Sequence, residues 1–197
     1  MRIRLGFILL MVVSLQAELR EYEIVPSEEN RLALEVFKTG FMSGKKHLFH
    51  FEQYRGKLSY DDGKPESSRI ELVLQSGSIA LKDTWLSDKD FKKVQQYALQ
   101  EMLAADRFSE ILFSSGQIRA KSAADYEIQG TLSIRGVSKP VMVHVAKKQE
   151  VGGKLVFEGR SQIRMKEYGL KPPSAALGTI GTKDEMAFSF MISVMPR

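Results

Sequence analysis

The sequence predicts an all-β protein, an antiparallel β-barrel with one α-helix inserted at about residues 88–105. Apolar and polar residues alternate with a period of two along most of the chain, which gives each strand one apolar face. Glycine, proline and aspartate separate these short runs, a spacing typical of sandwiches and barrels. The segment 88–105 alone lacks the alternation and is rich in helix-forming residues.

The first seventeen residues have the three-part layout of a secretory signal peptide. Arg2 and Arg4 form a positive start, Leu5–Leu15 is almost wholly apolar, and Ala17 supplies a small residue before the expected cleavage. The apolar run is shorter than the ~20 residues of a membrane span. We therefore expect residues 1–17 to be removed and the mature protein to be periplasmic or secreted. A buried first strand is the alternative.

The remaining residues, 18–197, show no internal boundary and are expected to form one domain. Cysteine is absent, which excludes disulfides and thiol chemistry. The net charge is +5, and the basic residues are scattered instead of forming a stripe with interleaved aromatics. This distribution argues against a nucleic-acid partner, while a transient contact with an anionic membrane surface stays open.

The strands are predicted where apolar residues recur at every second position. The clearest sets are Leu32/Leu34/Val36, Ile70/Leu72/Leu74, Tyr126/Ile128/Leu132/Ile134, Val141/Val143/Val145 and Phe188/Phe190/Ile192/Val194; shorter ones are Phe49/Phe51, Leu58/Tyr60, Ile79/Leu81, Ile111/Phe113, Leu155/Phe157 and Ile163/Met165. Turn sequences separate two of the strand pairs, at Asp61–Pro65 and at Gly152-Gly153, where glycine accepts a positive φ.

The inserted helix is expected to begin after Ser87, with Asp90 completing a capping arrangement. Its apolar residues recur at helical spacing on one face: Phe91, Val94, Ala98 and Met102. A helix cannot join the strand ladder, so this stripe must cover something. We predict that it packs over one end of the barrel, either as a lid with the Gly178–Gly181 loop as mobile partner, or as a static plug.

One motif resembles a known family. The segment Gly130–Val141 (GTLSIRGVSKPV) is similar to the signature hairpin of the YceI-like family, in which two strands meet at Arg135-Gly136. Weaker matches follow the family order at Tyr22–Ile24, Phe51/Tyr54/Gly56, Ile111/Phe113/Ser115, Tyr168–Leu170 and Asp184-Glu185.

The resemblance implies an elongated, lipocalin-like barrel with a long apolar cavity. It also implies a periplasmic carrier or binding protein for a long-chain amphiphile, such as a polyisoprenoid or isoprenoid quinone, with no other cofactor. The residues predicted to line the cavity are Phe49, Phe51, Leu74, Phe113, Phe157, Met165, Phe188 and Phe190. From the residues alone, a packed core and a cavity wall look the same.

No set of residues predicts catalysis or metal binding. If His47 and His50 lie on a strand, their offset of three sends them to opposite faces, and His144 is expected to face solvent. No nucleophile–base pair is apparent. An enzyme acting on a lipid or quinone held in the barrel stays the alternative.

A third hypothesis is a secreted interaction module that uses the outer face of the helix. That face would carry Lys89, Lys92, Lys93, Gln96 and Gln100. An ordinary solvated helix looks the same, so this pattern does not identify a partner.

Overall fold

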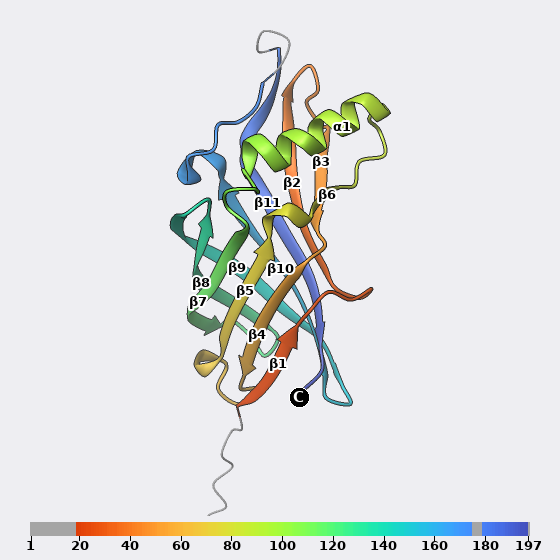
Figure 1. Ribbon diagram of the computed structural model, residues 1–197. Coiled ribbons are helices and arrows are strands. Elements are labelled where there is room, and N and C mark those ends of the chain that lie inside the picture. The colour runs from red at the N-terminus through yellow and green to blue at the C-terminus, as the bar shows by residue number, and fades with distance from the viewer. Residues whose placement is uncertain (1–18, 175–178, 197) are drawn as a thin grey trace, which may run out of the picture.

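The computed structural model describes residues 19–174 and 179–196, which form one curled antiparallel sheet of eleven strands (Figure 1). The sheet order is β1-β4-β5-β7-β8-β9-β10-β11-β2-β3-β6. The strands are β1 (Arg20–Ile24), β2 (Arg31–Gly40), β3 (Lys46–Phe51), β4 (Tyr54–Tyr60), β5 (Arg69–Gln75), β6 (Ile79–Leu81), β7 (Glu110–Ala120), β8 (Asp125–Ile134), β9 (Val137–Val151), β10 (Lys154–Arg164) and β11 (Ile180–Val194).

The two ends of the strand order come together because β3 and β4 are consecutive parts of one bent segment, and so are β5 and β6. β3 runs into β4 and β5 into β6, and backbone bonds from Glu52 to Ser78 and from Gln75 to Gln53 hold the bends together. At the lower end in Figure 1, β1 meets the end of β11 through a bridge between Tyr22 and Pro196. The all-β barrel is therefore confirmed.

The predicted turns are also confirmed. Arg135 and Gly136 join β8 to β9 with φ values of 50° and 76°, and Gly152 and Gly153 join β9 to β10 with 60° and 83°. Two successive positive φ angles match the right-handed twist of the paired strands. Asp61 begins the connection between β4 and β5, where its carboxylate accepts a hydrogen bond from the Lys64 amide.

The inserted helix lies across the upper end of the barrel (Figure 1). α1 (Asp88–Tyr97) is capped by Ser87, whose hydroxyl accepts from the Asp90 amide. The α-helix ends at Tyr97, earlier than the predicted range of 88–105. Residues 98–102 form a wider π-helical turn, closed by a bond from the Leu103 amide to the Ala98 carbonyl, and Ala104 then takes a left-handed φ of 45°.

The wall of the barrel is incomplete at this end because β6 is short and its outer edge pairs with no strand in the part of the chain that the structure describes. α1 takes that place. The Gln95 side-chain amide accepts from the Leu81 backbone and donates to the Ile79 carbonyl, as a neighbouring strand would. The tip of the β8–β9 hairpin adds a second attachment, because Arg135 donates to the carbonyls of Glu101 and Met102.

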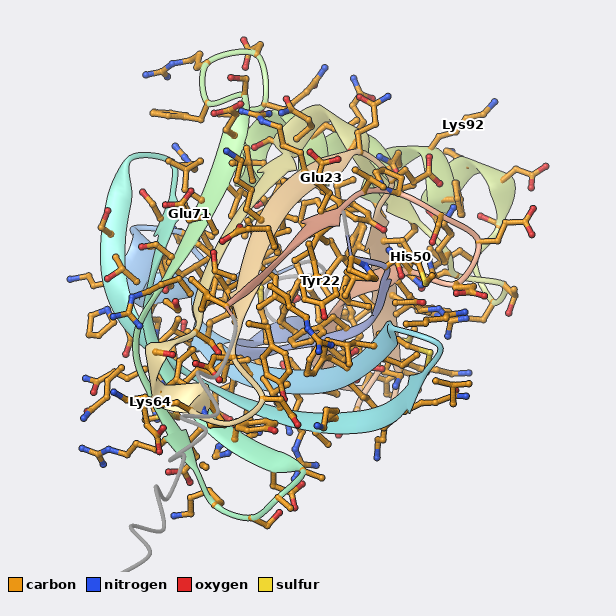
Figure 2. All side chains as sticks on the ribbon, turned by 90° about the horizontal axis from the view of Figure 1, so that it is seen from below. Tyr22, Glu23, His50, Lys64, Glu71 and Lys92 are labelled. Atoms are coloured by element: carbon orange, nitrogen blue, oxygen red, sulfur yellow. The ribbon has the colours of Figure 1, made fainter. Side chains whose placement is uncertain are left out.

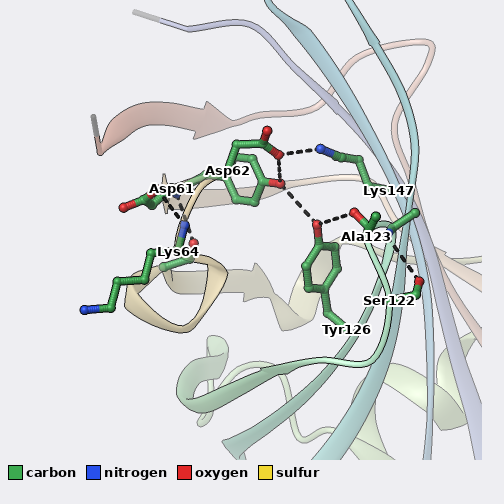
Figure 3. Close-up of polar contacts among 10 residues, drawn as sticks. Asp61, Asp62, Lys64, Ser122, Ala123, Tyr126 and Lys147 are labelled. Atoms are coloured by element: carbon green, nitrogen blue, oxygen red, sulfur yellow. Dashed lines mark hydrogen bonds and ion pairs between the residues drawn. The ribbon is translucent and has the colours of Figure 1, made fainter. Parts of the chain in front are cut away.

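The lower end is closed by a hydrogen-bonded network (Figure 3). The Tyr60 hydroxyl donates to Asp62 at 2.8 Å and lies 3.2 Å from the Tyr126 hydroxyl, which donates to the Ala123 carbonyl. Lys147 pairs with Asp62. Burial is the main cause that raises the pKa of Tyr60 above its usual value, so this phenol stays protonated and able to donate.

Two further predictions need correction. Ile180 and Gly181 are not part of a loop, because they pair with Gly40 and Thr39 as the first residues of β11. Met165 does not end a strand but begins a 3₁₀ turn, η4 (Met165–Tyr168). Gly178 and the predicted signal peptide lie outside the described residues.

Candidate functional site

The barrel encloses an apolar cavity of about 410 Å³ beneath the helix. Its wall comes from the inner faces of most strands and from the stripe of the helical segment, which contributes Val94, Ala98 and Met102. Seven of the eight residues predicted as lining residues lie on this wall: Phe49, Phe51, Leu74, Phe113, Met165, Phe188 and Phe190. Their contact with a ligand stays a prediction.

The eighth predicted residue, Phe157, lies elsewhere. It faces a smaller cavity of about 80 Å³ that continues toward the closed lower end, where Tyr60 and Tyr126 also line it. Phe157 is placed there because its ring packs edge-on against Tyr60, with 5.6 Å between the ring centroids. The two cavities share a partition made of Ile70, Ile128, Val145 and Phe190.

Two glycines make room for the largest rings of the wall. A Cβ atom on Gly159 would lie 2.2 Å from the ring of Phe190, its direct partner across the sheet. A Cβ atom on Gly130 would lie 2.6 Å from the ring of Phe113. The absence of a side chain at these two glycines therefore provides the space that the two aromatic rings occupy.

Polar groups of the cavity gather near the helix. They include Lys38 on β2, His47 on β3, Lys93 on α1 and Thr182 on β11. Sequence reasoning did not propose this set as a site. A signal for Lys38 was present, because it lies two residues beyond Val36 and so continues the inward face of that strand.

Lys93 is exposed, as predicted for the outer face of the helix. It lines the cavity together with Tyr97, one helical turn further on. Lys92 is exposed and projects away from the barrel (Figure 2). Lys89, Gln96 and Gln100 are also exposed, as predicted.

His47 is held in place by a buried carboxylate. Its Nδ1 atom lies 2.6 Å from Oδ2 of Asp83, whose side chain is 2% exposed and whose other oxygen accepts from the Leu48 amide. The ring of Trp85 stacks on the imidazole with 5.4 Å between centroids. These contacts occupy Nδ1 and one ring face, and they leave Nε2 without a protein partner among the described residues.

The other histidines do not join this group. His50 is on the opposite face of β3, as the offset of three predicts, and burial lowers its pKa. His144 is exposed, also as predicted. In the described part of the chain, no three His, Cys, Asp or Glu side chains lie close enough together to hold a metal ion.

A curled antiparallel barrel with an apolar interior is typical of the lipocalin-like class. The chain belongs to the YceI-like domain family, whose model matches residues 22–194. No helix among residues 19–174 and 179–196 is long and apolar enough to cross a membrane.

Curated relatives are called UPF0312 proteins. One from Pseudomonas savastanoi is 27% identical over 139 residues, which cover 66% of this chain and 67% of the relative. One from Azotobacter vinelandii is 25% identical over 165 residues, covering 79% of each chain.

Solved structures share the fold at low identity. BcnA of Burkholderia cenocepacia superposes with a TM-score of 0.68 at 17% identity, covering 86% of this chain and 98% of BcnA. A polyisoprenoid binding domain from Saccharophagus degradans, implicated in plant cell wall breakdown, gives 0.63 at 11% identity, covering 91% and 100%. Neither the family description nor these names specifies a reaction.

Proposed function

We propose that this protein is a periplasmic or secreted carrier that binds a long-chain amphiphile, such as a polyisoprenoid or an isoprenoid quinone, inside its barrel. The tail lies along the cavity wall and the polar end lies beneath the helix. The predicted signal peptide, residues 1–17, supports the location.

The observation that carries the proposal is the size and chemistry of the cavity. A volume of about 410 Å³ falls within the ~300–1,000 Å³ usual for ligand pockets. The wall is otherwise made of apolar and aromatic side chains; its polar residues are Lys38, His47, Lys93, Ser161, Ser174 and Thr182. Because burial of each methylene contributes roughly 0.8 kcal/mol, a long apolar tail binds such a wall tightly without specific polar contacts.

The similar structures support the same ligand class. The Saccharophagus degradans domain is named for polyisoprenoid binding, and its fold covers nearly the whole of this chain. In this chain the aromatic rings of Phe113 and Phe190 pack against Gly130 and Gly159 and form part of the apolar cavity wall.

Native mass spectrometry of the purified protein, followed by organic extraction, tests the proposal. We expect a bound long-chain lipid, released only on denaturation. Leu34→Trp, which adds an indole to the cavity wall, should lower the bound fraction at least severalfold, because its ring occupies the tail's volume.

Leu112→Trp is the matched control, since Leu112 is 44% exposed on the outer face of β7. This variant should retain the lipid of the parent protein. A parent protein that carries no lipid and takes up no geranylgeraniol would contradict the proposal. Periplasmic fractionation of the expressing cells tests the location separately.

A further inference from the structure

Four side chains able to donate hydrogen bonds, Lys38, His47, Lys93 and Thr182, border the cavity, and Lys93 among them is exposed at its surface. Lys38 and Thr182 are direct partners across β2 and β11. Val36, on the same inner face as Lys38, is the direct partner of His47 on β3. Three neighbouring strands therefore form one polar patch, and Lys93 on α1 also borders this space.

The lining side chains that can carry a charge near neutral pH are all basic. The described residues that line the cavity include two lysines and a histidine but no aspartate or glutamate. In the described part of the chain, neither Lys38 nor Lys93 forms an ion pair. Partial burial lowers the pKa of Lys38, which reflects the cost of holding an ammonium away from water without an anion.

The hydroxyl group of Thr182 gives a second, independent indication that a polar ligand group binds here. Its hydroxyl oxygen is buried and has no hydrogen-bond partner among the described residues. Buried hydroxyls are normally paired because an unmade hydrogen bond costs free energy. An acceptor atom on a ligand beside Lys38 is positioned to satisfy both groups.

Asp83 does not neutralise the patch from within the cavity. Its carboxylate is behind His47, occupied by Nδ1 of that ring and by the Leu48 amide, and it is not part of the lining. The imidazole of His47, which does line the cavity, thus separates the Asp83 carboxylate from the ligand space.

We propose that the bound amphiphile carries an anionic oxygen headgroup, a carboxylate or a phosphate, held by Lys38 and Lys93 with the Thr182 hydroxyl donating to it. This assignment rests on the proposed amphiphile-binding function and specifies the ligand class. His47, held by Asp83 and Trp85, forms the wall beside the headgroup.

The test compares two pairs of probes that differ only at the head: geranylgeranyl phosphate with geranylgeraniol, and arachidic acid with arachidyl alcohol. The full chain, stripped of co-purified lipid, is titrated with each. Trp85 is the only tryptophan and stacks on His47, so its fluorescence reports occupancy of this end. We expect at least one anion to bind about tenfold or more tightly than its alcohol, as for hydrogen bonds to charged groups.

The double variant Lys38→Met, Lys93→Met should abolish this preference, so that each anion binds no more tightly than its alcohol. Lys92→Met, Lys183→Met removes the same charge from outward positions next to Lys93 and Thr182 and should retain the preference. Preference for the phosphate alone identifies a phosphate headgroup, and preference in both pairs identifies any anionic oxygen group.

The outcomes separate the two proposals. If each anion and its alcohol bind the parent protein equally, amphiphile binding stands and the headgroup assignment is overturned. If none of the four probes binds, the proposed function fails as well. The comparison within the parent protein does not depend on whether the lysine variants fold.

Discussion

Gln95 occupies the place of a missing strand beside Leu81. Its Oε1 atom accepts a hydrogen bond of 2.7 Å from the Leu81 amide, and its Nε2 atom donates to the Ile79 carbonyl at 2.8 Å. Unpaired edge groups normally recruit another strand or face water. Here a side chain of α1 satisfies them, so the helix completes the barrel wall.

We expect Gln95→Met to loosen this joint, because methionine fills similar space but leaves both edge groups unpaired. The loss should be about 1–2 kcal/mol in the free energy of unfolding. Amide exchange at Leu81 should also accelerate. Gln96→Met, at an exposed position of the same helix, is the control and should change neither quantity. Equal behaviour of the two variants would contradict the role of Gln95.

The helix is expected to act as a lid and not as a static plug. None of the residues of α1 is fully buried, whereas β10 buries alternate residues along most of its length. Segments with little buried surface open locally at lower free energy. Hydrogen exchange of α1 should therefore be faster than that of β8–β10 and should slow when geranylgeraniol is added. If the amides of α1 are protected from exchange as strongly as those of the strands, and ligand does not change this, the helix is a static plug and not a lid.

Gly159 is predicted to be intolerant of any side chain. A Cβ atom there would lie 2.2 Å from the Phe190 ring and 2.9 Å from the His144 carbonyl oxygen, so Gly159→Ala should cost about 1–3 kcal/mol. Adding Phe190→Leu should recover part of the loss, since the two residues share one contact. Gly77→Ala is the control, because a Cβ atom on Gly77 would have no atom within 4 Å apart from its chain neighbours. Chemical denaturation measures all three.

Asp62 should contribute to stability only above acidic pH. Hydrogen bonds from Lys147 and then Tyr60 lower its pKa, so the ionised carboxylate stabilises the folded state. That contribution is complete above the unfolded-state pKa of about 4 and is lost as the pH falls toward the lower folded-state pKa. Its size is below about 1 kcal/mol, because the Asp62 side chain is 61% exposed.

Asp62→Asn should therefore reduce the free energy of unfolding at pH 7 and have little effect near pH 2. Asp106→Asn, an exposed residue before β7, is the matched control. A loss that is the same at both pH values would show that the hydrogen bonds to Asp62 do not depend on its charge.

Local patterns in the sequence determined the strands, the turns and the position of the helix. The period of two identified the inward faces, and seven predicted lining residues do face the larger cavity, because alternation along a strand is a local property of the backbone. The end of the helix was predicted less well. The π-helical turn at 98–102 depends on packing and on Arg135, which is distant in sequence.

The grouping of polar residues at one end of the cavity arises only in the tertiary structure. Thr182 and Lys38 are far apart in the chain and become neighbours through the pairing of β11 with β2. Asp83 follows β6 and reaches His47 only because β6 pairs with β3. Strand alternation specifies which side of a sheet a residue occupies, but strand order and register bring particular residues together, and these arise from long-range pairing that no short stretch of sequence encodes.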